Sequence, residues 1–187
     1  GSLDEVFAAN IGSGPDRIVN CIEIDGNGRI LVAGGMLYFN NSYSGNLLRL
    51  NSDGTLDATF AGNVYTNSVG RGVNALHLMS DGKLMVGGQF DYIDNQPMKA
   101  LARLESNGAA DATFDPPLFD ANQVVNAIAL LDDNNLLIGG NRWSGTYGGF
   151  LHQTDALGNI VNDFAELDLS NQSIMTIKPL PSGGFLA

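Results

Sequence analysis

The chain has 187 residues, of which 44% are hydrophobic and only 16% are charged. Nine Lys and Arg stand against 20 Asp and Glu, so the formal net charge is −11 at pH 7. This balance argues against a nucleic acid partner, because nucleic acid recognition depends on Lys and Arg that neutralise phosphates. It also argues against binding to anionic lipid. No apolar run reaches membrane-spanning length, and the single cysteine, Cys21, excludes an intrachain disulfide.

A unit of roughly 50 residues recurs along the chain, which is the mark of a tandem repeat. Its copies share a Val-Asn segment, an apolar run that ends in paired glycines, a Leu-rich run and a short piece that ends in phenylalanine. The paired glycines close the runs NGRILVAGG, DGKLMVGG and NNLLIGG. The aromatic ends are Phe7, Phe60, Phe114 and Phe164, which are separated by 53, 54 and 50 residues. We expect these four rings to be buried between repeats in equivalent environments.

The units follow one another without an interdomain linker. Residues 1–7 are predicted to be the last strand of a preceding repeat. Residues 19–60, 73–114 and 125–164 are three full repeats, and residues 174–187 begin a fourth that is cut short. We therefore expect an open arc, which further repeats of a longer chain or a second copy would complete into a ring.

Each full repeat contains four short apolar segments bounded by turns such as Asp53-Gly54, Asp81-Gly82 and Asn107-Gly108. Runs of this length rich in Val, Ile, Leu and aromatics predict strands, and Asp-Gly or Asn-Gly turns favour hairpins. Four antiparallel strands per repeat are typical of a β-propeller blade. The predicted fold class is therefore all-β, with about three and a half blades in tandem.

The repeats resemble the delta-60 β-propeller repeat of bacteria, best in GKLMVGGQF (82–90) and NLLRLNSDGTLDATF (46–60). The resemblance covers nearly the whole chain. It implies a secreted or cell-surface protein, and it supplies no catalytic residue and no cofactor.

Positions shared between copies are expected to serve the fold. Asp4, Asp57 and Asp111 occupy one repeat position, where a carboxylate can cap a turn by accepting backbone N–H bonds. Arg49 and Arg103 match each other, with Gln153 in the third copy. We expect each arginine to form a hydrogen bond or ion pair with a neighbouring turn.

Positions that differ between copies are where a binding surface would lie. The loops after the paired glycines vary most and combine aromatic with polar side chains. The binding candidates are Tyr38, Phe39, Tyr43, Asp91, Tyr92, Asp94, Arg142, Trp143 and Tyr147. The connectors between repeats, with Tyr65, Arg71, Phe119 and Asp120, form a second variable class. Such loops suit a glycan or a protein partner, which predicts a non-catalytic recognition scaffold.

Two alternatives stay open. The loop aromatics can instead seal the edges between blades, which would make the chain a structural spacer or assembly element. A propeller glycoside hydrolase is the third hypothesis, but the sequence offers no positioned acidic pair. His77 and His152 have no metal-ligand spacing with other residues, so we predict no metal site and no enzyme. The acidic turns at 25–28, 53–57 and 132–135 keep calcium open as a minor alternative.

Overall fold

The computed structural model describes residues 2–66, 71–98, 100–114, 122–131, 135–143, 147–164, 169–181 and 184–187. This part of the chain is almost entirely β-structure, with one short helix. Each complete repeat folds into an antiparallel sheet whose strands follow one another in chain order. The strands of the first sheet are β1 (Val19–Ile24), β2 (Ile30–Gly34) and β5 (Leu47–Leu50). Those of the second sheet are β7 (Gly72–Leu78), β8 (Leu84–Gln89) and β11 (Leu101–Leu104).

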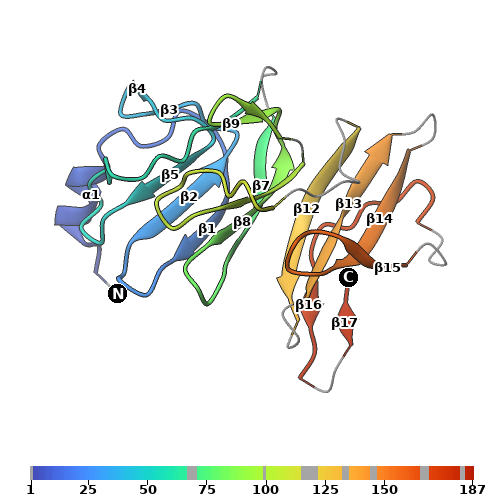
Figure 1. Ribbon diagram of the computed structural model, residues 1–187. Helices are drawn as coiled ribbons and strands as arrows, with labels where there is room; N and C mark the ends of the chain where they lie inside the picture. Colours follow the sequence, from blue (N-terminus) through green and yellow to red (C-terminus); the bar gives the residue numbers. More distant parts are fainter. Residues whose placement is uncertain are drawn as a thin grey trace.

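The third sheet has four strands: β12 (Gln123–Leu130), β13 (Leu136–Trp143), β14 (Tyr147–Thr154) and β15 (Ile160–Asp163). A two-stranded sheet of β16 (Lys178–Pro179) and β17 (Phe185–Leu186) begins the fourth repeat. Neighbouring sheets stack face to face, with β7 against β1 and β2, and β12 against β7 and β8. In Figure 1 the helix α1 (Glu5–Ile11) and the β16–β17 pair lie at opposite ends of the stack. The expected all-β architecture of stacked antiparallel blades is confirmed.

The core lies between the blades because each sheet buries both of its faces against neighbours. Along β8, Leu84 and Val86 pack toward the first blade, while Met85 packs toward the third. The first strands of the first and second blades differ in their burial. Ile22 on β1 is 58% exposed, whereas its counterpart Leu76 on β7 is 7% exposed. The leading face of the first blade is therefore open at its first strand.

Steric contacts explain why glycine occupies these paired positions. In the second and third sheets the second glycine of the pair, Gly88 or Gly140, lies opposite a β-bulge in the first strand, between residues 73 and 75 or 125 and 127. In the first sheet the glycine opposite the bulge, between residues 19 and 21, is Gly34, the first of its pair. A Cβ on Gly88 would lie 2.1 Å from the carbonyl oxygen of Gly72. A Cβ on the first glycine of that pair, Gly87, would lie 2.4 Å from a methyl group of Val125 in the next blade. The missing side chain of Gly88 thus leaves room for the bulge, and that of Gly87 leaves room for the side chains of the next sheet.

The bulges present an asparagine ladder that runs across the blades. Asn20 donates from Nδ2 to Oδ1 of Asn74 at 3.1 Å, and Asn74 donates to Oδ1 of Asn126 at 3.0 Å. Asn126 continues the ladder with a 3.2 Å bond to the carbonyl oxygen of Ile174 in the fourth repeat. The recurring Val-Asn segment therefore combines an apolar core residue with a polar link to the next blade.

The prediction of a strand over residues 1–7 is wrong, because the helix α1 occupies Glu5–Ile11. Asp4 caps this helix by accepting a hydrogen bond from the N–H of Phe7, and Glu5 places a negative charge in the first turn. Ile11 packs onto the same face of the first blade as Val32 and Leu48. The backbone groups of this segment are therefore satisfied within a helix.

The predicted fourth strand is also absent from the first and second blades. Only single bridges, Leu50 to Leu56 and Leu104 to Ala110, remain there. In both blades the aspartate that follows forms a tight turn: Asp57 Oδ1 accepts from the N–H and the hydroxyl of Thr59 at 2.9 and 2.6 Å. The third repeat has Val161 at this position, so the turn cannot form and β15 pairs with β14.

A buried ion pair joins the same aspartate to the strand before it, as the sequence predicts. Arg49 Nε lies 2.8 Å from Asp57 Oδ2, and Arg103 Nε lies 2.7 Å from Asp111 Oδ2. Each arginine also reaches the next blade, where Arg49 Nη1 donates to the carbonyl oxygen of Ser106 at 2.7 Å. Arg103 makes the equivalent bond to the carbonyl of Ala156. The arginines therefore link three groups: their own turn, the next blade and an aromatic ring.

That ring is Phe60 under Arg49 and Phe114 under Arg103, with the guanidinium carbon 4.6 and 5.0 Å from the ring centre. The expectation of four equivalent buried rings is only partly correct. Phe114 is fully buried, whereas Phe7, Phe60 and Phe164 are half-buried. Phe164 packs edge-on against Phe185 of the fourth repeat instead of against an arginine.

The Arg103–Asp111 pair predicts strong coupling between its two members. Arg103→Gln and Asp111→Val install the residues found at these positions in the third repeat. Asp111→Val leaves the buried Arg103 without its carboxylate, so we expect this change to cost about 3–5 kcal/mol. Arg103→Gln should cost less, because Asp111 keeps its ion pair with Lys83 at 2.7 Å. The double variant should cost less than the sum of the two single changes. Urea unfolding of the four proteins measures this coupling, and strict additivity would contradict it.

The differing ring environments predict different costs of truncation. Phe114→Ala should lower the free energy of unfolding by about 3–5 kcal/mol, because a fully buried ring leaves a cavity. Phe60→Ala should cost clearly less, because that ring is partly open to solvent and loses less buried area. Chemical denaturation of both variants checks the order of the two losses.

Candidate functional site

The variable loops after the paired glycines form hairpins in the first two repeats. β3 (Tyr38–Phe39) pairs with β4 (Ser42–Tyr43), and β9 (Tyr92–Ile93) pairs with β10 (Gln96–Pro97). The turn residues have positive φ, 50° and 63° at Asn40 and Asn41, and 49° and 62° at Asp94 and Asn95. Two consecutive left-handed residues make a type I′ turn, which matches the strand twist and favours Asn and Asp.

A connector from the previous repeat supports each hairpin. β6 (Val64–Tyr65) pairs with β9, so that a three-stranded sheet with the order β10-β9-β6 forms. In the first repeat, Pro15 makes a single bridge to Phe39 in the same way. The two variable classes of the sequence, loops and connectors, therefore build one structure at the upper edge of the blades in Figure 1.

Four tyrosines of these hairpins form two cross-strand pairs. Tyr38 and Tyr43 are opposite each other, with ring centres 5.8 Å apart in an edge-to-face arrangement. Tyr65 and Tyr92 are opposite each other and stacked, with ring centres 5.2 Å apart. Partial burial, together with the nearby hydroxyls of Tyr65 and Tyr38, raises the pKa of Tyr43. The N–H of Asn46 donates to the carbonyl oxygen of Val64 at 2.8 Å, so the segment after Tyr43 lies beside the strand that carries Tyr65. We call the four rings of these two neighbouring pairs the tyrosine row.

The tyrosine row is open to solvent at one end and held rigidly at the other. Tyr38 is 44% exposed and Tyr43 is 61% exposed. Tyr65 and Tyr92 are half-buried, and the hydroxyl of Tyr65 donates to Oδ1 of Asn95 at 2.7 Å. The row therefore offers exposed aromatic edges on a pre-formed support.

The acidic candidates of the second hairpin have structural partners. Asp94 accepts from Nδ2 of Asn63 at 3.0 Å and from the N–H of Ala110 at 3.0 Å. These bonds tie the hairpin to the connector and to the body of the blade. Asp91 accepts from the hydroxyl of Thr66 at 3.0 Å.

The structure brings together only some of the predicted binding residues. Tyr38, Tyr43 and Tyr92 lie in the tyrosine row, with Asp91 and Asp94 in the adjacent hairpin. Phe39 is a correction: it is buried in the core beside Val32 and Met36, so it does not contribute to a binding surface. The fourth member of the row, Tyr65, was not among the predicted binding residues. Its position in a variable connector was the available signal, but the pairing of that connector with the loop was not visible in the sequence.

The remaining candidates lie on the third blade. Arg142 and Tyr147 are exposed at the end of the β13–β14 hairpin, where Trp143 is the backbone partner of Tyr147. The Trp143 side chain, Phe119 and Asp120 lie outside the described residues.

Ionisable groups in the described chain do not form a metal cluster. No group of three or more His, Cys, Asp or Glu side chains is arranged to hold a metal ion there. His152 is buried on β14 with Nδ1 3.1 Å from Asp163 Oδ1, and it stacks on Phe150. Burial lowers the pKa of His152 although Asp163 opposes the shift. The described residues also contain no helix of the length and apolarity needed to cross a membrane.

Comparisons with known proteins bear on the repeats. One crystal structure, the extracellular domain of a protein described as a hybrid two component system from B. thetaiotaomicron, aligns with 92% of this chain at 17% identity and a TM-score of 0.44. The chain spans 26% of the length of that structure. Comparison with curated proteins finds no similar sequence.

A family model described as "Domain of unknown function (DUF5122) beta-propeller" matches residues 26–60 and 80–114. Each matched segment runs from the turn before the second strand to the aromatic end of the repeat, in the first and the second blade. The match agrees with the stacked antiparallel sheets and with the resemblance to the delta-60 repeat. The match covers two of the repeats and is consistent with a β-propeller repeat family.

Proposed function

We propose that this chain is a non-catalytic recognition module of a secreted or cell-surface protein. Its tyrosine row binds a glycan or a protein partner. The observation that carries the proposal is the solvent exposure of Tyr38 and Tyr43 beside the stacked pair of Tyr65 and Tyr92. Exposed aromatic groups held in fixed positions are the anchors that binding surfaces use, because they bury a large area at a low cost in conformational entropy.

The chemistry of the neighbourhood supports this function. The type I′ turns contain Asn41 and Asn95. Oδ1 of Asn95 accepts from the hydroxyl of Tyr65, and amides both donate and accept hydrogen bonds. A sugar can stack on a ring and bond to these groups, and a peptide backbone can do the same. Placement at the cell surface or outside the cell rests on the delta-60 resemblance.

A structural spacer is the alternative, and a specific observation favours it. The Tyr65 hydroxyl bonds to Asn95, and Asp94 bonds to Ala110, so part of the hairpin is tied to the blade. In a spacer all four rings would contribute to folding. The two hypotheses differ in what the exposed pair, Tyr38 and Tyr43, does.

The double variant Tyr38→Ala/Tyr43→Ala separates them. If the row binds a partner, this variant should lose retention on a glycan array or in a cross-linking pull-down. Its melting temperature should stay close to that of the unchanged protein, because a cross-strand pair contributes only about 0.2–1 kcal/mol. Tyr147→Ala is the matched control, since it removes an exposed tyrosine outside the row. Binding that survives the double variant, or a large loss of stability, would support the spacer instead.

A further inference from the structure

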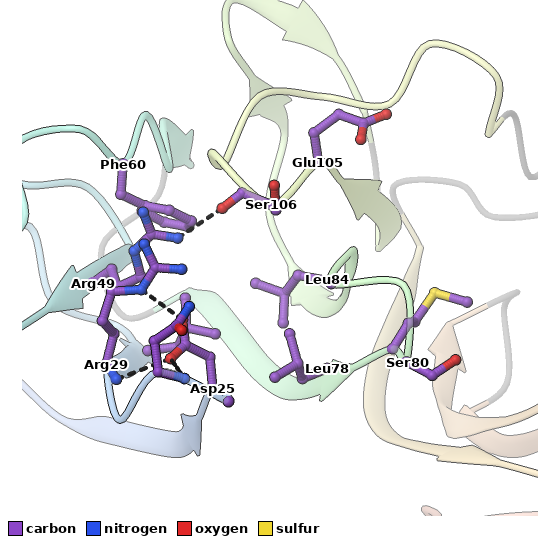
Figure 2. Close-up of a pocket in the computed structure, with 14 residues that line it drawn as sticks. Asp25, Arg29, Arg49, Phe60, Leu78, Ser80, Leu84, Glu105 and Ser106 are labelled. Carbon is purple, nitrogen blue, oxygen red and sulfur yellow. Dashed lines mark hydrogen bonds and ion pairs between the residues drawn. The ribbon is translucent and has the colours of Figure 1, made fainter.

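A second concave site lies between the first and second blades, at the end of the sheets opposite to the tyrosine row. It is a pocket of about 360 Å³, which falls within the range of small-molecule sites. The turn before β2, the turn before β8 and the turn after β11 surround it. Leu78, Leu84 and Phe60 form an apolar wall, and Asp25, Arg29 and Glu105 provide the polar groups (Figure 2).

The polar wall is specific to the first repeat. Asp25 occupies the position of Met79 in the second repeat and of Leu131 in the third. Its side chain is 10% exposed, and it accepts hydrogen bonds from the N–H groups of Asn27 and Arg29 and from Arg29 Nε at 2.7 Å. A buried carboxylate therefore fixes the orientation of the Arg29 guanidinium.

This orientation holds the Arg29 guanidinium away from the carboxylate of Asp57. Its Nη1 lies 3.8 Å from Asp57 Oδ2, beyond hydrogen-bond distance. In the second repeat the equivalent cation is Lys83, which reaches the equivalent carboxylate of Asp111 at 2.7 Å. In the first repeat Asp25 thus binds the guanidinium of Arg29 in place of Asp57. The Nη groups of Arg29 lie beside the pocket.

The charges on the walls balance. Arg29 and Arg49 are paired with Asp25 and Asp57, and Glu105 is paired with Lys83 at 2.8 Å. Guanidinium donors and carboxylate acceptors consequently stand side by side without net charge. The overall charge of −11 disfavours an anionic ligand. A purely apolar ligand would strip water from charged groups without replacing their hydrogen bonds.

We propose that this pocket binds a neutral ring that carries several hydroxyl groups, with the chemistry of a single pyranose sugar. Hydroxyl groups both donate and accept, so hydroxyls on opposite sides of the ring can pair with Arg29 and with Glu105, which face the pocket from different sides (Figure 2). The C–H face of such a ring packs on Leu78 and Leu84. The site is separate from the tyrosine row and does not depend on the function proposed for it.

The test is titration of the ¹⁵N-labelled protein with methyl glycosides of glucose, galactose and mannose, followed by NMR. We expect saturable amide shifts in the turns 25–29 and 79–83 with at least one of the three sugars. The variant Asp25→Met/Arg29→Lys installs the residues of the second repeat and should weaken binding by about tenfold or more. Arg142→Lys, which makes the same Arg-to-Lys change at an exposed position of the third blade outside the pocket, is the matched control, and it should retain the shifts. So should Tyr38→Ala/Tyr43→Ala, which alters only the tyrosine row.

Several results would overturn the proposal. These are the absence of shifts at tens of millimolar sugar, shifts that map elsewhere, and shifts that persist unchanged in Asp25→Met/Arg29→Lys. Butyrate that binds in place of the sugars would show that the site selects a carboxylate, which also contradicts the proposed ligand. If the double variant does not fold, Ser80→Trp replaces it, because Ser80 is an exposed lining residue whose enlargement fills the pocket.

Discussion

The stacking of each sheet on the next is the constraint on which the rest of this structure depends. A single sheet of three or four short strands cannot bury both of its faces, so two of the three core clusters lie between blades. The third covers the other face of the first blade, where Ile11 and Phe39 pack on Val32 and Leu48. Polar links accompany the apolar packing between blades. The asparagine ladder joins the first strands, and each buried arginine reaches the following blade's turn. Such directional bonds fix how far one blade is rotated against the next, which apolar contacts alone leave loosely defined.

The third repeat shows how these links depend on one another. Gln153 stands where the other copies have arginine, and Val161 stands where they have aspartate. Loss of one partner alone would leave a buried charge unpaired, and here both are replaced. The consequence is visible in the backbone. Without the aspartate turn the segment 160–163 continues as a strand, and the cross-strand neighbours His152 and Asp163 form the polar contact. A change in two side chains thus converts a turn into the fourth strand of a sheet.

This dependence explains how much the sequence could predict. The first three strands of each repeat follow from local apolar runs and glycine turns, so they were predicted correctly. The helix over Glu5–Ile11 was missed because its sequence resembles the end of a repeat, where a strand was expected, while Asp4 in fact caps a helix. The aspartate turns at Asp57 and Asp111 were expected to cap, but not to end pairing. Burial of the phenylalanines differs for the same reason, since it depends on which blade lies beside each ring.

The candidate sites, too, could be predicted only in part from the sequence. Variation between copies located the hairpins correctly, because hairpin tips are free of packing constraints. It could not show that Phe39 turns inward or that Tyr65 joins Tyr92, since both depend on pairing with a distant connector. Asp25 is the sharper case. Within its own turn it makes the same bonds as any turn aspartate, and its effect appears only in the contact between two blades. At that contact Asp25 holds the guanidinium of Arg29 beyond hydrogen-bond distance of Asp57. In a stacked array, new sites can therefore arise at the interfaces without any change in the strands that hold them.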